Sequence, residues 1–174
     1  MKNILLIGNG AREHVLAEAI ARSLQAPRLF SYMKTNNPGI SSFSEQIQLG
    51  RYDDLEAIGE FAKACAADLA VIGPEDPLNE GVVDYLASRG ISCVGPRKSL
   101  ARLETSKSFT RNLLEKYNVP GNITFKAFSS MEGMEAFLEK LDGIVLKPDG
   151  LTGGKGVLVQ GEHFESRSEA LKAC

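Results

Sequence analysis

Residues 147–157 read Lys-Pro-Asp-Gly-Leu-Thr-Gly-Gly-Lys-Gly-Val, between two short apolar runs. Glycine lets backbone amides approach phosphate oxygens, and lysine adds positive charge. Two departures exclude a Walker A loop: Asp149 stands where the first glycine is needed, and Gly156 replaces the Ser or Thr after the lysine. A β-branched run follows instead of a helix. We therefore predict a phosphate-binding hairpin tip, with a plain surface hairpin as the alternative.

A second glycine-rich loop, Gly-Asn-Gly-Ala-Arg-Glu at residues 8–13, lies between an expected strand and an expected helix. It begins like the dinucleotide fingerprint G-x-G-x-x-G, but Glu13 replaces the third glycine. The next expected strand also lacks a terminal acid for the ribose hydroxyls, which disfavours a nicotinamide cofactor. Amides at a helix N-terminus, together with Arg12, still predict an anion site. A strand-to-helix turn without a ligand is the alternative.

An acidic loop, Gly73-Pro74-Glu75-Asp76-Pro77, follows another apolar run. The two prolines restrict its backbone, so Glu75 and Asp76 are held in place. The acidic pair is suited to binding an amine or hydroxyl groups. Favourable charge at the start of the following helix explains the same residues equally well.

Short apolar runs alternate with helical spacing as far as residue 96. We expect strands at 4–7, 28–33, 69–72 and 91–94, helices at 13–24, 53–66 and 79–89, and turn chemistry at 34–44. This alternation predicts an α/β fold with an open parallel sheet. Ligands of such sheets bind beyond the carboxyl ends of the strands, which is where the loops at residues 8 and 73 lie.

The pattern changes after residue 100. We expect a helical stretch at 99–117 with a break near 104–106, a strand at 122–128, a helix at 131–141, hairpin strands at 143–147 and 156–160, and a short helix capped by Ser166 or Ser168. This second part is α+β. The predicted domains are therefore 1–100 and 101–174.

The bulk properties are those of a globular protein: 43% of the 174 residues are hydrophobic, 24% are charged and the net charge is −2. That charge argues against nucleic-acid or membrane-surface partners, which require a positive field. The apolar run at the N-terminus is too short for a signal sequence or a membrane span. Cys65, Cys93 and Cys174 have neither disulfide nor metal-site spacing, so we expect inert thiols in a cytoplasmic protein.

Five motifs occur in an order similar to that in the phosphoribosylamine–glycine ligase (glycinamide ribonucleotide synthetase) family of the ATP-grasp superfamily. They are G-N-G-x-R-E-H, G-P-E-x-P-L, the G-P near residue 95, S-K-x-F near residue 106 and K-x-D-G-L-x-x-G-K-G-V. The resemblance covers essentially the whole chain. It implies an open parallel-sheet N-terminal (pre-ATP-grasp) domain followed by a partial α+β ATP-grasp small subdomain.

The resemblance also implies a reaction, in which ATP with Mg²⁺ or Mn²⁺ activates glycine as glycyl phosphate and 5-phosphoribosylamine attacks it, in purine biosynthesis. The implied ATP-binding residues are Lys107, Lys147, Gly153, Gly154, Lys155 and Gly156. The implied phosphoribosylamine-binding residues are Gly8, Asn9, Gly10, Arg12, Glu13, His14, Gly73, Pro74 and Glu75. For His14, capping or packing in the first helical turn is an equal alternative.

The chain departs from this family in length, since family members are more than twice as long. The larger ATP-grasp lobe, a partner from the same protein, and its metal ligands lie outside this sequence. We therefore expect no metal site here, assign no catalytic residue and expect no ligase activity from this chain alone. Another purine-pathway ATP-grasp enzyme, such as a carboxylase, and a non-catalytic nucleotide- or phosphoribosyl-binding module are the alternatives. The R-E-H and G-P-E-x-P-L motifs favour the glycine ligase.

Overall fold

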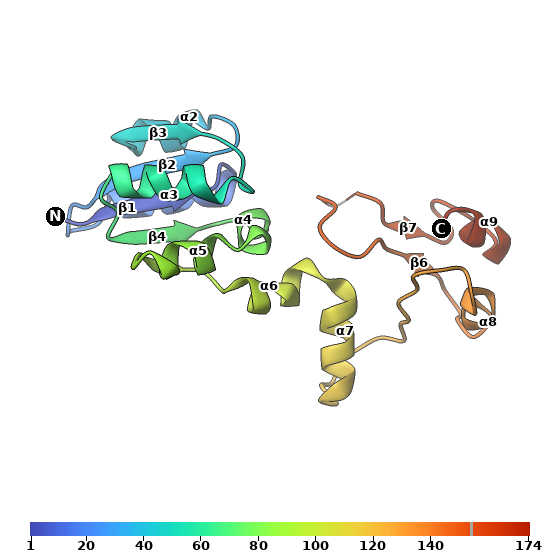
Figure 1. Ribbon diagram of the computed structural model, residues 1–174. Coiled ribbons are helices and arrows are strands. Elements are labelled where there is room, and N and C mark those ends of the chain that lie inside the picture. The colour runs from blue at the N-terminus through green and yellow to red at the C-terminus, as the bar shows by residue number, and fades with distance from the viewer. Residues whose placement is uncertain (154) are drawn as a thin grey trace. The chain divides into compact units, whose positions relative to one another are not determined.

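The computed structural model describes residues 1–153 and 155–174. The chain forms two compact units, Met1–Arg102 and Leu103–Cys174 (Figure 1). Each unit has its own hydrophobic core.

The first unit is built on a five-stranded parallel sheet with the order β3-β2-β1-β4-β5 (Figure 1). Its strands are β1 (Asn3–Ile7), β2 (Arg28–Met33), β3 (Gln46–Leu49), β4 (Leu69–Ile72) and β5 (Ser92–Val94). The four predicted strands are confirmed. The strand β3 was not predicted, because at the edge of the sheet it alternates glutamine with apolar residues and has no continuous apolar run.

Helices cover both faces of this sheet, as a parallel sheet requires. They are α1 (Ala11–Ala21), α2 (Pro38–Phe43), α3 (Leu55–Ala64), α4 (Glu75–Glu80) and α5 (Val82–Ser88). One core, under α1 and α2, contains Leu6, Ala17, Leu29, Met33 and Ile40. The larger core on the other face contains fully buried residues of α3 and α5, including Ile58 and Leu86.

Two predictions in the first unit were wrong. The predicted turn at 34–44 contains α2, because the side chain of Asn37 accepts hydrogen bonds from the amides of Gly39 and Ile40 and so caps a helix. The predicted helix at 79–89 is two helices, α4 and α5. They are separated at Gly81, whose φ of +89° ends α4 in the left-handed conformation.

The second unit contains α7 (Lys107–Lys116), α8 (Met134–Leu138), β6 (Val145–Leu146), β7 (Leu158–Val159) and α9 (Arg167–Lys172), while α6 (Lys98–Thr105) contains the boundary between the units. The strands β6 and β7 pair antiparallel, which confirms the predicted hairpin. The predicted helix break is also confirmed, since Ser106 caps α7 by accepting from the amide of Phe109 at 3.2 Å. The predicted strand at 122–128 is wrong, because no strand of the described chain pairs with that segment.

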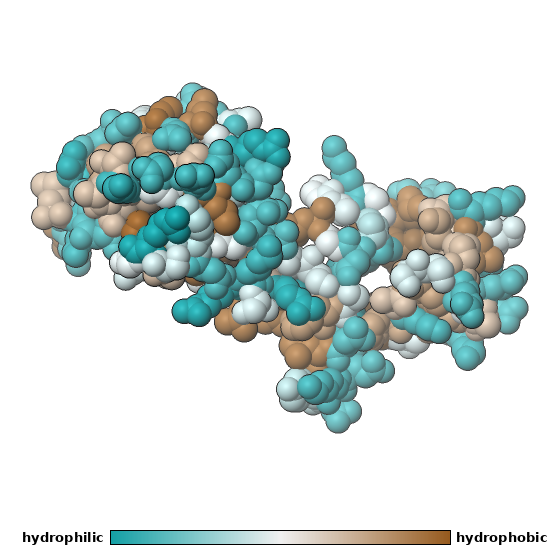
Figure 2. All heavy atoms as spheres, viewed as in Figure 1, coloured by the Kyte–Doolittle hydropathy of each residue, from teal (hydrophilic) through white to brown (hydrophobic). Residues whose placement is uncertain are grey.

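The core of the second unit is small and consists of Met134, Leu138, Ile144, Phe164 and Ala170. The helix α7 has no buried residue. Large apolar side chains after it remain exposed, among them Tyr117 and Ile123. In Figure 2, brown areas lie in the region of α6 and the beginning of α7, whereas much of the visible surface of the first unit is teal.

The three cysteines are free thiols. Burial raises the pKa of the Cys65 and Cys93 thiols, which favours the protonated, unreactive form. Within the described ranges, no helix is long and apolar enough to cross a membrane.

Candidate functional site

The loops after β1 and β4 lie side by side at the carboxyl edge of the first unit's sheet. The strands pair in parallel from Ile4 opposite Leu69 to Ile7 opposite Ile72, and the amide of Gly73 donates to the Ile7 carbonyl at 3.0 Å. On its other side β1 pairs with β2. The chain therefore adds β2 and β3 on one side of β1, and then β4 and β5 on the other side, so the switch point of the sheet lies between β1 and β4. Ligands of open α/β sheets bind at such a switch point.

Glu13 occupies the space between these two loops. Its side chain is only 2% exposed. Its Oε2 atom accepts a hydrogen bond from the Gly10 amide at 2.6 Å, and so caps the start of α1. Its Oε1 atom is buried and has no hydrogen-bond partner among the residues that the structure describes. Glu13 therefore holds the loop between β1 and α1 in place through its hydrogen bond to Gly10.

Three glycines leave room for this carboxylate. A Cβ atom at Gly8 would lie 2.4 Å from Cγ of Glu13, and one at Gly73 would lie 2.4 Å from both Cγ and Oε1. At Gly10 the added atom would lie 2.8 Å from Oε2. Glu13, which breaks the dinucleotide fingerprint, thus leaves no room for side chains at the two remaining glycines of that fingerprint. At Gly8 a Cβ atom would also lie 2.7 Å from Cδ of Pro74, and the φ of +136° favours glycine as well.

Asn9 is held by the loops that follow β2 and β3. Its Nδ2 donates to Oγ1 of Thr35 at 3.0 Å, and its Oδ1 accepts from the Tyr52 hydroxyl at 2.6 Å. The side chain of Asn37 donates to the Asn9 carbonyl at 3.1 Å. Burial, with the nearby charges of Glu13 and Asp76, raises the pKa of Tyr52 to about 12, so its hydroxyl stays protonated and donates. Both polar atoms of the Asn9 side chain are therefore bonded within the chain.

Arg12 and Glu75 connect the two loops on the solvent side. Nη2 of Arg12, in the first turn of α1, lies 3.1 Å from Oε2 of Glu75 at the start of α4. Exposed ion pairs of this kind contribute about 0–1 kcal/mol to stability. Both side chains can therefore exchange partners with a bound molecule at little cost to the fold.

In the second unit, the first turn of α7 contacts the beginning of the glycine-lysine loop. Nζ of Lys107 donates to the carbonyl of Gly150 at 2.6 Å. The Asp149 carboxylate accepts from the Ser108 amide at 3.2 Å and from the hydroxyls of Ser106 and Ser108. Burial tends to raise the pKa of Asp149, but these hydrogen bonds outweigh it and lower the pKa to about 2. The carboxylate is charged at neutral pH.

Both units match family models of one enzyme. Residues 2–104 match the N domain of phosphoribosylglycinamide synthetase, and residues 105–174 match its ATP-grasp (A) domain. The chain belongs to the phosphoribosylglycinamide synthetase family. This finding confirms the resemblance described for the five motifs.

Curated relatives in this family are named phosphoribosylamine–glycine ligase. That of Methanocaldococcus jannaschii is 51% identical over 97% of this chain and 39% of its own length. That of Methanobrevibacter smithii is 45% identical over 96% of this chain and 38% of its own length. The chain therefore spans about 39% of the length of such relatives.

Solved structures of other enzymes share the fold. N5-carboxyaminoimidazole ribonucleotide synthetase from Thermotoga maritima gives a TM-score of 0.74 at 16% identity, over 100% of this chain and 44% of that one. The ADP complex of N5-carboxyaminoimidazole synthetase from Staphylococcus aureus gives 0.71 at 13% identity, over 98% of this chain and 43% of that one. Together with the match of residues 105–174 to an ATP-grasp (A) domain, these likenesses confirm the predicted fold class, an α/β domain followed by part of an ATP-grasp fold.

The structure distributes the residues implied by family membership over the two units. The residues predicted to bind phosphoribosylamine lie in the first unit, around the ends of β1 and β4, except that His14 packs on α2, with its ring centroid 6.3 Å from that of Phe43. Those predicted ATP-binding residues that the structure describes lie in the second unit. Of these, Lys107 reaches the glycine-lysine loop, while Lys147 and Lys155 are exposed on it. Gly154 lies outside the described residues.

Sequence reasoning did not assign a role to Tyr52 or to Asp149. Asp149 was noted as a departure from the Walker motif and as the acid of the K-x-D-G-L motif, without a role of its own. A lysine between two serines at a helix start, Ser106-Lys107-Ser108, is the signal that would have pointed to an acceptor for those hydroxyls.

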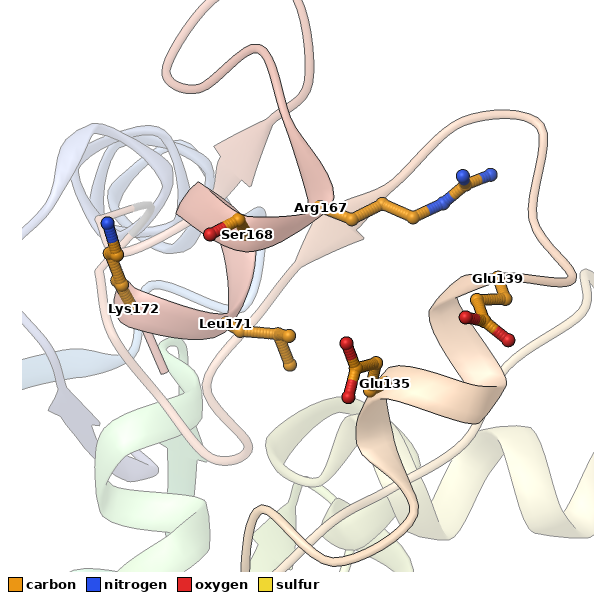
Figure 3. Close-up of a pocket in the computed structure, with 6 residues that line it drawn as sticks. All are labelled: Glu135, Glu139, Arg167, Ser168, Leu171 and Lys172. Carbon is orange, nitrogen blue, oxygen red and sulfur yellow. The ribbon is translucent and has the colours of Figure 1, made fainter.

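A cavity of about 340 Å³ in the second unit involves different residues (Figure 3). It lies between α8 and α9 and is lined by Glu135, Glu139, Arg167, Ser168, Leu171 and Lys172. Arg167 donates to the carbonyls of Leu138 and Leu141, both at 3.2 Å. The cavity is thus a groove between two short helices and includes none of the predicted site residues. Elsewhere in the described chain, too, no three His, Cys, Asp or Glu side chains are grouped so as to hold a metal ion.

Proposed function

We propose that this chain supplies the phosphoribosylamine site and one side of the ATP site of a ligase that joins glycine to 5-phosphoribosylamine through glycyl phosphate, in purine biosynthesis. The observation that carries this proposal is the 51% identity, along 97% of the chain, to a relative named phosphoribosylamine–glycine ligase. The other side of the ATP site, with the ligands for Mg²⁺ or Mn²⁺, would come from the part of such ligases that this chain does not span. The free thiols fit a cytoplasmic location.

The chemistry of the first unit supports the phosphoribosylamine assignment. The first amides of α1 have no acceptor within the helix, and they suit a phosphate group together with Arg12. The carboxylates of Glu75 and Asp76 suit the amine and hydroxyl groups of the same substrate. Binding would replace the ion pair between Arg12 and Glu75, measured at 3.1 Å, by contacts of each residue with the substrate. Glu13 and Asn9 would act by holding the loop, since their side chains already bond within the chain.

The second unit supports the ATP assignment through its charges. Phosphoryl transfer depends mainly on positioning and on neutralising the charge of the transferred group. Lys107, Lys147 and Lys155 would provide positive charge, and the backbone at Gly153 and Gly156 leaves no side chain between the amides and a phosphate. The solved S. aureus N5-carboxyaminoimidazole synthetase is complexed with ADP, which agrees with a nucleotide site in this fold.

Calorimetric titration of the chain with ribose 5-phosphate and with ATP tests the two assignments separately. Arg12→Gln should weaken binding of ribose 5-phosphate about tenfold, a loss of about 1.4 kcal/mol. The matched control is Arg22→Gln, which removes an equally exposed arginine paired with Glu18 at the other end of α1 and should leave the affinity unchanged.

For ATP, Lys107→Gln should weaken binding by a similar factor, and Lys116→Gln at the other end of α7 serves as its control. Unchanged affinity in Arg12→Gln would contradict the phosphoribosylamine assignment. Equal losses in the Lys107 and Lys116 variants would contradict the ATP assignment, since general charge would then explain both.

A further inference from the structure

Asp149 joins two segments of the second unit that are distant in sequence. It follows β6 at the start of the glycine-lysine loop and contacts Ser106 and Ser108 at the start of α7. The neighbouring contact from Lys107 to the Gly150 carbonyl spans 43 residues of chain at 2.6 Å. We call these contacts of Asp149 and Lys107 the Asp149 latch.

The Asp149 carboxylate also changes what the start of α7 can bind. Free amides in the first turn of a helix normally attract an anion. Here the Ser108 amide already donates to Asp149 at 3.2 Å. The hydrogen-bonding groups at the start of α7 are thus satisfied by the chain itself. The Lys107 ammonium, by contrast, donates one of its three N–H groups to the Gly150 carbonyl and has two left for a ligand.

Ser106 couples the latch to the helix. Its hydroxyl oxygen accepts from the Phe109 amide at 3.2 Å and so caps α7, while its proton is directed to Asp149, also at 3.2 Å. A hydroxyl group can accept and donate at the same time. The helix cap and the loop therefore share one side chain.

Packing does little to hold this loop at Gly150 and Gly153. A Cβ atom added at Gly150 or Gly153 would meet nothing within 4 Å. The hydrogen bonds to Asp149 are charge-assisted, and such bonds are roughly twice as strong as neutral ones. They therefore restrain where the loop leaves β6, beside the close approach of Pro148 to Gly156.

We propose that Asp149 is a positioning residue, which ties the glycine-lysine loop to α7 and keeps Lys107 beside it. Asp149 itself need not touch the nucleotide. The positioning role concerns the loop of this chain directly, and its effect on ATP rests on the function proposed above.

Limited trypsin digestion of the 174-residue chain tests the latch without a nucleotide. The Lys155–Gly156 bond lies in the loop, and Lys147 is followed by proline, which trypsin does not cut. Asp149→Ala should raise the rate of cleavage after Lys155 about tenfold, which corresponds to about 1.4 kcal/mol. Asp149→Asn, which keeps an acceptor but not the charge, should give an intermediate rate. Asp142→Ala removes an exposed acid just before β6 and is the control that should match the wild type.

Cleavage after Arg167, which lies in α9 and donates to the carbonyls of Leu138 and Leu141, measures opening of the whole second unit in the same digest. The proposal is overturned if Asp149→Ala is cut after Lys155 at the wild-type rate. It is also overturned if cleavage after Arg167 rises by the same factor, because the variant would then merely unfold the unit.

Titration with ATP gives the second measurement. Asp149→Ala should weaken ATP binding, and the double variant with Lys107→Gln should bind no more weakly than Lys107→Gln alone, since both changes act through the same lysine. Additive losses would overturn a role through Lys107. If the wild-type chain binds no ATP, the proposed function fails, and the cleavage rates after Lys155 still decide the positioning role.

Discussion

In the first unit, a Cβ atom added at Gly8, Gly10 or Gly73 would lie less than 3 Å from the side chain of Glu13. In the second unit, Gly150 and Gly153 have open space around them but adopt φ values of +83° and +59°. Close packing requires the first set of glycines, of which Gly8 also has a φ of +136°. The second set is required by backbone conformation alone, since other residues rarely adopt these φ values. Similar glycine-rich sequences therefore do different work in the two units.

The acids beside these glycines differ in the same way. Glu13 is buried and leaves one carboxylate oxygen without a partner among the described residues. Asp149 is exposed and accepts several hydrogen bonds. Moving Glu13 would disturb the packing of two strand ends, whereas releasing Asp149 breaks only polar contacts at the surface. The first loop is a fixed part of its unit, and the second can open locally at a much smaller cost.

Gly73→Ala should show the largest effect, because the new Cβ would lie 2.4 Å from Glu13 in a closely packed site. We expect the free energy of unfolding of the first unit to fall by about 3 kcal/mol, the upper range for overpacking. Urea denaturation followed by circular dichroism measures it.

Gly90→Ala is the control for this change. Gly90 has a φ of +79° and open space around it, so only backbone strain of about 1 kcal/mol is expected. Adding Glu13→Ala to Gly73→Ala should recover part of the loss. If Gly73→Ala costs no more than Gly90→Ala, packing is not what fixes the first loop.

Tyr52→Phe should have an intermediate effect, because it removes the hydroxyl that donates to Asn9 at 2.6 Å. Leaving that acceptor unsatisfied should lower the free energy of unfolding by about 1–2 kcal/mol. Tyr85→Phe is the control, since the Tyr85 hydroxyl has no hydrogen bond in the described part of the chain. Equal losses in the two variants would contradict a bracing role for Tyr52.

The pH dependence of stability gives an independent measure of Tyr52. Its pKa is raised to about 12 in the folded chain, against about 10 when unfolded. The unfolded tyrosine therefore releases its proton first, so this contribution to stability is complete below pH 10 and disappears as the pH rises to about 12. The free energy of unfolding of Tyr52→Phe should fall less steeply over this pH range than that of the wild type. Part of the fall that remains comes from Tyr32, because burial also raises the pKa of its hydroxyl.

Gly150→Ala should show the smallest effect of the three. Its new Cβ meets nothing within 4 Å, so only the strain of a φ of +83° remains, about 1 kcal/mol. Gly143→Ala, which has open space and no positive φ, should change the free energy of unfolding of the second unit by less than about 0.5 kcal/mol. A loss near 3 kcal/mol in Gly150→Ala would mean that the second loop is packed like the first.

Much of the fold could be predicted because strands of a parallel sheet are buried on both faces and appear as apolar runs, as Ile4–Ile7 does. The edge strand β3 lacks that pattern. The segment at 122–128 has a strand-like composition, but a strand forms only with a partner, and local sequence does not specify one. Asn37 was assigned to a turn because the same side chain can begin a turn or cap a helix.

For the candidate site, the order of motifs was sufficient to identify the family, but the contacts and roles of individual residues could not be predicted from it. Glu13 was recognised as breaking a fingerprint, yet its place between Gly8 and Gly73 depends on strands 65 residues apart lying next to each other. Asp149 likewise depends on a contact between segments 41 residues apart. Long-range contacts of this kind follow from the fold and leave little trace in local sequence.

The central strand of the sheet, β1, is synthesised first, but one of its two neighbouring strands is synthesised much later. β1 pairs with β2 on one side, but its other edge pairs with β4, where Ile4 lies opposite Leu69. As the chain leaves the ribosome, that edge stays open until residue 72 has emerged. An open strand edge is a template for other chains. A pause in translation before that point would therefore leave the edge of β1 open to aggregation, and a later pause, before β5 has emerged, would leave the edge of β4 open instead.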